Sequence, residues 1–395
     1  MTDLETRAAP PRAGALRRAA PALLGYAAVR ALGLLVLFLW SAARDKSAYT
    51  LLTARWDALW YVRVAELGYG YEVRLANGDV HSNLAFFPLL PWLERLVAAV
   101  SPLSYADGGF VVGLLASFAA AWGIFAVADR VHGRRAGVCA VLLWAALPVG
   151  IVQSMAYSES LFTALAAWSL YAVLTGRWVT AGALALSAGL TRPVGVAVVA
   201  AVWVAAIASF LAERRELAGA APGGAGPPAS AARRVTGLLL APLGTAGYVL
   251  WVGHRTGGGP LGYLDVQAGW RNGFDGGYAF ARFVAEKFTS FPSALAGAGL
   301  LAGVVSVVWL YGVGVRRRQP LPLLVYSGVV TALALCASSY FGSKPRLLMP
   351  AFPLLLPLAV ALAGQRSRRS AWVLGILAVA SAVYGAFWLN GSGPP

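Results

Sequence analysis

The chain has 395 residues, of which 59% are hydrophobic and only 12% are charged, and its mean hydropathy is +0.67. This composition excludes a soluble protein of two or three globular domains, the class that the length alone would suggest. Apolar windows of about 18–22 residues recur along the chain, each long enough to cross a hydrocarbon core of about 30 Å. Because the two-residue alternation of a membrane β-barrel is missing, we expect an all-α polytopic membrane protein.

The net charge of +16 comes from 32 basic and 16 acidic residues. A single alternating topology puts most of the basic residues on one side of the membrane, the pattern that marks the cytoplasmic side. The charge therefore predicts an orientation in the cell membrane rather than a nucleic-acid partner. These basic residues are eighteen of the 32, namely Arg7, Arg12, Arg17 and Arg18 of the N-terminal tail, then Arg130, Arg134, Arg135, Arg177, Arg214, Arg215, Arg233, Arg234, Arg316, Arg317, Arg318, Arg366, Arg368 and Arg369.

Residues 1–19 are expected to form a cytoplasmic tail, followed by a first membrane helix over 20–41. The run Leu32–Trp40 has the apolar character of a signal peptide, but the apolar stretch has full bilayer length, which favours an uncleaved helix. Residues 42–107 then form a first outer loop. Within it, the spacing of apolar residues predicts an interfacial helix over 55–68 and a second, more apolar helix from about 86 to 100.

The rest of the chain is a series of further apolar segments, which brings the total to about 11 transmembrane helices. We expect a cytoplasmic linker at 212–235, a second outer loop at 254–291 and an outer C-terminal tail at 390–395. The transmembrane domain as a whole covers 20–389. Its later helices are expected at 108–128, 136–152, 158–175, 178–211 (two helices broken at Thr191-Arg192-Pro193), 236–253, 292–315, 321–340, 347–364 and 371–389.

The stretch 55–61 of the first outer loop is the strongest candidate for chemistry. It places the carboxylate of Asp57 between Trp56 and Trp60, with Arg55 before them and Tyr61 after them. Aromatic neighbours desolvate a carboxylate and raise its proton affinity, which suits a general base. They also suit a sugar, whose C–H face stacks on indole. The alternative is a structural one, in which Asp57 caps an interfacial helix and pairs with nearby arginines.

Four further charged residues are candidates on the same side. Arg192 breaks an apolar region, and Lys344 and Arg346 stand on the outer side, where the orientation rule disfavours basic residues. Arginine offers two parallel donors to phosphate oxygens, so a lipid phosphate is the expected partner. Glu159 begins a helix and is a second candidate for catalysis. The alternatives are that Arg192 extends to the membrane surface and that Glu159 only complements the helix dipole.

Motifs for cofactors and nucleotides are missing from the sequence. There is no Walker motif, no Gly-rich dinucleotide loop and no Asp-x-Asp motif for a nucleotide–metal complex. His81, His132 and His254 are far apart and have no metal-ligand spacing. We therefore expect neither a cofactor nor a metal. The expected donor has a single phosphate, which arginine alone can neutralise.

Several motifs resemble, in order, those of the PIG-V family, the GPI mannosyltransferase II enzymes and their bacterial relatives. Together they span most of the chain between residues 55 and 353. They are Trp56-Asp57 with Trp60-Tyr61 and Gly68-Tyr69, the run from Asn83 to Pro91, Ser158 to Phe162, Thr191 to Gly195, and Arg346 to Pro353.

The resemblance implies a GT-C-type glycosyltransferase that takes mannose from a polyprenyl-phosphate carrier on the extracytoplasmic side and inverts the anomeric centre. It implies Asp57 as the catalytic base. The acceptor would be a lipid, a glycan or a protein in contact with the membrane lipids. The alternative functions are a transporter or flippase of lipid-linked sugars and a non-catalytic scaffold. Convergence of Asp57, Glu159, Arg192 and Arg346 on one outer site would favour the enzyme.

Overall fold

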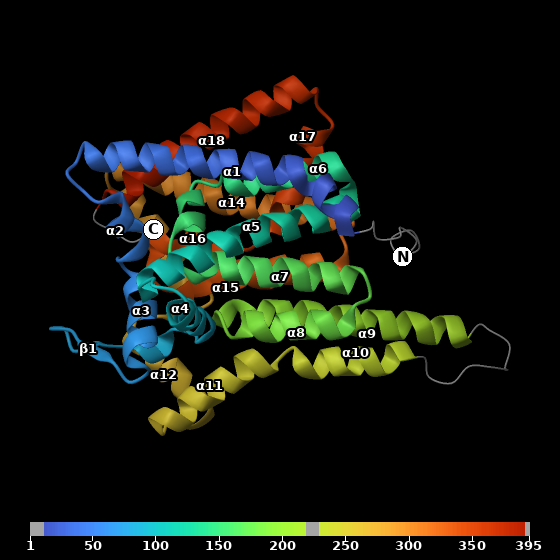
Figure 1. The fold of residues 1–395 in the computed structure, drawn as a ribbon, viewed down its shortest axis with the longest axis horizontal. Helices are drawn as coiled ribbons and strands as arrows, with labels where there is room; N and C mark the ends of the chain where they lie inside the picture. The colour runs from blue at the N-terminus through green and yellow to red at the C-terminus, as the bar shows by residue number, and fades with distance from the viewer. Residues whose placement is uncertain (1–11, 219–228, 392–395) are drawn as a thin grey trace.

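The computed structural model describes residues 12–218 and 229–391, which form a bundle of long helices with smaller elements at one end (Figure 1). Most of the long helices run along a common direction. The helices of the bundle are α1 (Arg12–Ala42), α5 (Tyr105–His132), α6 (Arg134–Ala145), α7 (Ser158–Leu174), α8 (Trp178–Gly189), α9 (Val196–Ala218), α10 (Ala229–Leu240), α11 (Leu243–Thr256), α14 (Ser293–Arg316), α15 (Leu321–Cys336), α17 (Leu356–Ala363) and α18 (Ser367–Leu389).

Six helical segments of the described residues are long and apolar enough to cross a membrane, or up to seven if one bent pair counts as a span. Three apolar helices, α7, α8 and α15, are shorter. The prediction of an all-α membrane protein is confirmed. The predicted count of about 11 is not, because several of the expected segments are interrupted before they reach the length of a bilayer.

Proline accounts for the main interruptions. The span expected at 347–364 is instead α16 (Lys344–Leu348) and a 3₁₀ turn (Phe352–Leu355) leading into α17, with a bend of 75° between the two halves. Pro350 lies at the bend. It breaks the helix there because proline donates no backbone hydrogen bond and clashes with the preceding turn. Similarly, α6 ends at Ala145 rather than near 152, three residues before Pro148. Pro242 also lies at the junction of α10 and α11, but there Ala231–Thr256 still counts as one segment long and apolar enough to cross a membrane.

The predicted boundaries of the tail and linker need correction. Helix α1 begins at Arg12, so the helix extends into the expected tail of 1–19, and residues 1–11 lie outside the described part. The expected linker 212–235 is helical at both ends, and only 219–228 lie outside the description. Helix α18 ends at Leu389, directly before the expected C-terminal tail of 390–395. Within that tail, residues 392–395 are not described.

The first outer loop contains both expected interfacial helices. They are α3 (Asp57–Leu67) and α4 (Leu89–Val100), preceded by a short α2 (Ala48–Thr53). Between them, β1 (Glu72–Arg74) and β2 (Val80–Ser82) pair antiparallel, with Val73 opposite His81. The second outer loop contains α12 (Gly262–Gly269), α13 (Tyr278–Glu286) and β3 (Gly273–Phe274), and β3 pairs with β4 (Ala337–Ser338) beyond α15.

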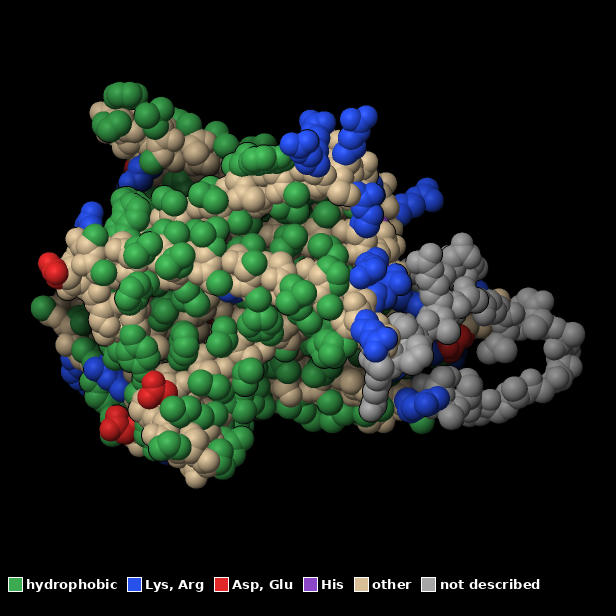
Figure 2. Space-filling view, turned by 45° about the horizontal axis from the view of Figure 1, so that its top comes forward, with side chains coloured by type: hydrophobic (Ala, Val, Ile, Leu, Met, Phe, Trp, Pro, Cys, Tyr) green, Lys and Arg blue, Asp and Glu red, His purple; other side chains and the backbone are tan. Residues whose placement is uncertain are grey.

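Charge separates the two ends of the bundle. Figure 2 shows Lys and Arg gathered at one end of the bundle, beyond a surface rich in hydrophobic side chains. We call this the basic end. There Arg18 pairs with Asp129, and Arg135 donates to the Gln365 carbonyl. The opposite end carries α2, α3, α4 and α12 (Figure 1), and we call it the loop end.

Candidate active site

Asp57 is placed by a strained turn between α2 and α3. Ser47 caps α2 by accepting a hydrogen bond from the Thr50 amide, and α3 begins at Asp57 itself. Trp56 between the two helices has φ 51°, a conformation that costs energy for a residue with a large side chain. Backbone strain of this kind concentrates at functional sites. It turns the chain so that the Asp57 carboxylate lies at the start of α3.

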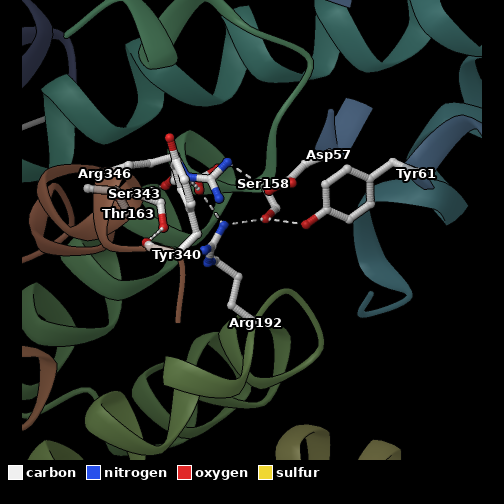
Figure 3. Close-up of polar contacts among 9 residues, drawn as sticks. Asp57, Tyr61, Ser158, Thr163, Arg192, Tyr340, Ser343 and Arg346 are labelled. Carbon is white, nitrogen blue, oxygen red and sulfur yellow. Dashed lines mark hydrogen bonds and ion pairs between the residues drawn. The ribbon is translucent and has the colours of Figure 1, made fainter. Parts of the chain in front are cut away.

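Four charged side chains, predicted separately from the sequence, meet at the loop end. Arg346 donates from Nη1 to Asp57 Oδ2 at 2.7 Å. The Nε atom of the same guanidinium lies 3.3 Å from Glu159 Oε1. Arg192 Nη1 is 2.6 Å from Glu159 Oε1. Asp57, Glu159, Arg192 and Arg346, which we call the ionic cluster, come from α3, α7, the break before α9, and α16; Figure 3 labels all but Glu159.

Burial distinguishes the two carboxylates of the ionic cluster. The Glu159 side chain is 1% exposed, whereas that of Asp57 is 25% exposed. The side chains of Arg346 and Arg192 are 9% and 13% exposed. Two carboxylates face two guanidinium groups, so the ionised cluster has no net charge. Asp57 is therefore its accessible carboxylate, and Glu159 its buried one.

These contacts differ in two details from the structural alternatives considered for the sequence. Trp56, not Asp57, occupies the cap position of α3, and the Asp57 carboxylate pairs with Arg346. Arg192 does not extend to the surface, because its side chain turns inward to Glu159. Glu159 does lie in the first turn of α7, where the helix dipole favours it, but it also contacts both arginines.

Hydroxyl groups hold the cluster from the side of α3. The Tyr61 hydroxyl and the Ser158 hydroxyl lie 2.7 Å apart, and Arg192 Nη1 donates to Ser158 Oγ at 3.0 Å (Figure 3). Burial raises the pKa of Tyr61, with further contributions from nearby charges, so its hydroxyl stays protonated. The Tyr157 ring lies 5.1 Å from the Arg346 guanidinium carbon. Sequence reasoning assigned no role to Tyr157 or Ser158, although both directly precede Glu159.

The aromatic candidates lie beside the ionic cluster rather than within it. Trp60 stacks on Phe86 with ring centres 5.7 Å apart and meets Trp270 of the second outer loop at 4.8 Å. Arg55 lies over the Trp56 ring at 4.4 Å. Trp60 therefore joins the two outer loops, and Trp56 supports Arg55. The contacts with substrate predicted for Arg55, Trp56 and Trp60 stay predictions.

Lys344 has a different environment from the one expected for a phosphate ligand. Its side chain is buried, and its ammonium donates to the carbonyl oxygens of Ala334 at 2.8 Å and Ala337 at 2.5 Å. These carbonyls lie at the end of α15, where cations satisfy unpaired acceptors. The structure does not bring Lys344 into the ionic cluster. Within the described ranges, no group of three or more His, Cys, Asp or Glu residues could hold a metal ion.

Comparison with known proteins gives matches in structure only. The sequence matches no known family model and no curated protein. The fold is similar to that of ArnT from Cupriavidus metallidurans bound to undecaprenyl phosphate, with a TM-score of 0.52 and 16% identity over 89% of this chain and 63% of ArnT. It is also similar to the apo state of the same ArnT, with a TM-score of 0.51 and 14% identity over 92% of this chain and 74% of that one.

The likeness to ArnT defines the fold class. The chain is a helical membrane bundle whose fold is like that of ArnT, and this likeness agrees with the fold predicted from the sequence. It spans 63% of the length of the lipid-bound ArnT chain, so part of ArnT has no counterpart here. Nothing in the comparisons is specific to the PIG-V family or to mannose.

Proposed function

We propose that this protein is an integral membrane glycosyltransferase that moves a sugar from a polyprenyl-phosphate carrier to an acceptor hydroxyl. The observation that carries the proposal is the convergence of Asp57, Glu159, Arg192 and Arg346 at one end of a GT-C-type bundle. The lipid phosphate bound to ArnT supports a donor of this class. The motifs that resemble the PIG-V family favour mannose as the sugar, with inversion at the anomeric carbon.

Asp57 acts as the general base in this proposal. The acceptor oxygen attacks the anomeric carbon and gives its proton to the Asp57 carboxylate as the new glycosidic bond forms. The bond between the anomeric carbon and the phosphate oxygen breaks on the opposite face, and the polyprenyl phosphate departs with both electrons of that bond. Asp57 suits this role because it is the accessible carboxylate of the cluster.

Arg346 and Arg192 bind the phosphate and stabilise the charge that develops on it as it leaves. Arg346 reaches the phosphate by exchanging its hydrogen bond with Asp57 for bonds to the phosphate oxygens. The sequence suggested Glu159 as a second catalytic residue. Its 1% exposure and its contacts with both arginines favour a positioning role instead.

The loop end faces the extracytoplasmic side in this proposal, because basic residues gather at the other end (Figure 2). The N-terminus then lies in the cytoplasm, and the donor sugar is presented outside. The acceptor would be a lipid, a glycan or a protein that reaches the membrane surface.

The test is to incubate the purified full chain with polyprenyl-phosphate-[14C]mannose and membrane lipids, and to identify the labelled product. A parallel reaction with the glucose-bearing carrier tests the choice of sugar. We expect a product whose anomeric configuration is opposite to that of the donor. A protein that moves the intact labelled donor across proteoliposome membranes without forming product would instead be a transporter or flippase, and the proposal would fail.

A further inference from the structure

The turn between α1 and α2 carries basic residues that the proposed reaction has not used. Arg44 and Lys46 are exposed in this turn, and Arg55 follows α2. Neither Arg44 nor Lys46 forms an ion pair with any described acidic residue. All three lie at the loop end, where the orientation rule disfavours basic residues. We call Arg44, Lys46 and Arg55 the basic turn.

Two shallow, widely open recesses adjoin the basic turn. The first has a volume of about 490 Å³ and is lined by Val36, Leu39, Trp40, Ala43 and Arg44. The second has a volume of about 310 Å³ and is lined by Lys46, Ser47, Thr50, Leu51 and Arg55. The first recess is apolar apart from Arg44, and Val36, Leu39 and Trp40 of its lining belong to a candidate membrane span. The second is more polar and lies beyond the end of that span. A lipid with an anionic headgroup likewise has an apolar chain and a charged, polar end.

The second recess lies beside the candidate active site. Arg55 is two residues before Asp57 and stacks on Trp56, the strained residue between them. The Leu52 carbonyl of α2 accepts a hydrogen bond of 3.0 Å from the Ala156 amide, directly before Tyr157. Figure 1 shows α2 between the end of α1 and α3. A phosphate in the second recess would therefore lie next to the elements that hold the ionic cluster.

Charge favours a phosphate at this position. The ionic cluster has two carboxylates and two guanidinium groups, so it has no spare positive charge. The phosphodiester of the donor brings one negative charge, and the polyprenyl phosphate monoester left after transfer brings nearly two. Asp45 lies between Arg44 and Lys46 and offsets part of their charge, so the three cations of the basic turn leave a net charge of +2 close to the cluster. Cations near a membrane surface attract anionic headgroups.

We propose that the basic turn binds the phosphate of a polyprenyl-phosphate lipid, with the first prenyl units in the apolar recess on α1. The identity of the lipid rests on the proposed function. The new element is the position: the phosphate docks at Arg44, Lys46 and Arg55 before it reaches Arg346. Ordinary anionic phospholipids share the headgroup chemistry, and the test separates the two.

Binding of undecaprenyl phosphate to the purified full chain in detergent is the measurement, with undecaprenol and phosphatidylglycerol as comparison lipids. The variants are Arg44→Gln, Arg44→Gln/Lys46→Gln and, to fill the apolar recess, Ala43→Trp. Arg316→Gln/Arg317→Gln at the basic end removes the same charge and is the control. Because Lys46 also donates to the Asn390 carbonyl, the single Arg44 variant guards against a general loss of structure.

We expect the affinity for undecaprenyl phosphate to fall about fivefold for each cation removed, while binding of undecaprenol is unchanged. Ala43→Trp should weaken both lipids, and the control should bind both normally. The proposal would be overturned by any of three results. The control variant could lose as much affinity for undecaprenyl phosphate, phosphatidylglycerol could compete equally well, or the wild-type protein could fail to bind undecaprenyl phosphate. Sugar transfer is measured separately, so a binding site without transfer would refute the enzyme and leave the site standing.

Discussion

Asp57 and Arg346 are 289 residues apart in the chain and share a hydrogen bond of 2.7 Å. The partner of Asp57 was not predictable from the sequence. The local pattern offered Arg55 and Arg63, which stack on aromatic rings instead. What the sequence did show was the scarcity of acidic residues and the position of Asp57 among aromatic ones.

Replacing Asp57 with asparagine tests its role as the base. Asp57→Asn keeps the shape of the side chain but cannot accept the proton, so the variant should bind the donor while kcat falls by at least about 10²–10⁴-fold. Asp57→Glu should keep a little activity, because a base is present in a displaced position. The measurement is steady-state transfer of labelled sugar, with donor binding determined separately. An Asp57→Asn enzyme with full activity would move the catalytic role to another residue.

Arg346 tests the recognition of phosphate. Arg346→Ala should raise the apparent KM for the donor or abolish turnover, because a charge-assisted hydrogen bond is worth about 1.5–3 kcal/mol, or roughly 10- to 150-fold. Arg318→Ala, at the basic end, should change neither parameter. Arg346→Lys keeps the charge that Asp57 and Glu159 need, and so separates phosphate binding from folding. Small and equal effects of Arg346→Ala and Arg318→Ala would refute the role.

Among the elements, α4 packs on α5 through an unusual contact. Glu94 of α4 is fully buried, and neither of its carboxyl oxygens has a hydrogen-bond partner among the residues that the structure describes. A Cβ atom at Gly109 of α5 would lie 2.5 Å from Glu94 Oε1, so a larger residue there would force the carboxyl group to shift. Burial raises the pKa of Glu94 well above the ordinary range of a glutamate.

This contact predicts a dependence of stability on pH. Because the pKa of Glu94 is raised in the folded state, its contribution is complete at acidic pH and is lost as pH rises towards that folded value. Glu94→Gln removes the titration. The wild type should therefore lose stability relative to Glu94→Gln by about 1.4 kcal/mol per pH unit above the ordinary pKa of glutamate. Thermal unfolding in detergent across pH measures this, and Glu66→Gln, at an exposed acid, should show no such divergence.

Helical elements were easier to predict than their ends. The apolar segments around α1, α5, α14 and α18 are long and uninterrupted, and their positions follow from hydropathy alone. The bend at Pro350 and the early end of α6 depend on how prolines are accommodated by neighbouring helices. The pairing of β3 with β4 joins segments more than sixty residues apart, and no local pattern indicates it.

At the scale of the whole molecule, the charge distribution predicts a topology. In a background with Cys139 and Cys336 replaced by alanine, Asn77→Cys at the loop end should react with an impermeant thiol reagent in intact cells. Arg317→Cys at the basic end should be shielded, because the basic end faces the cytoplasm. Both positions are exposed on the protein, so burial does not account for a difference. Labelling of Arg317→Cys from outside would reverse the orientation and the side on which Asp57 lies.

The neutrality of the ionic cluster has a kinetic consequence. The donor carries one negative charge on its phosphate, but the polyprenyl phosphate released after transfer carries nearly two. Once Asp57 has taken the proton of the acceptor, the ionic cluster carries one net positive charge. It therefore holds the released polyprenyl phosphate more strongly than the donor, since the attraction grows with charge. We therefore expect strong product inhibition, with an inhibition constant for polyprenyl phosphate below the KM of the donor. Removal of the spent carrier would then limit the rate, and a phosphatase that consumes it should accelerate steady-state transfer.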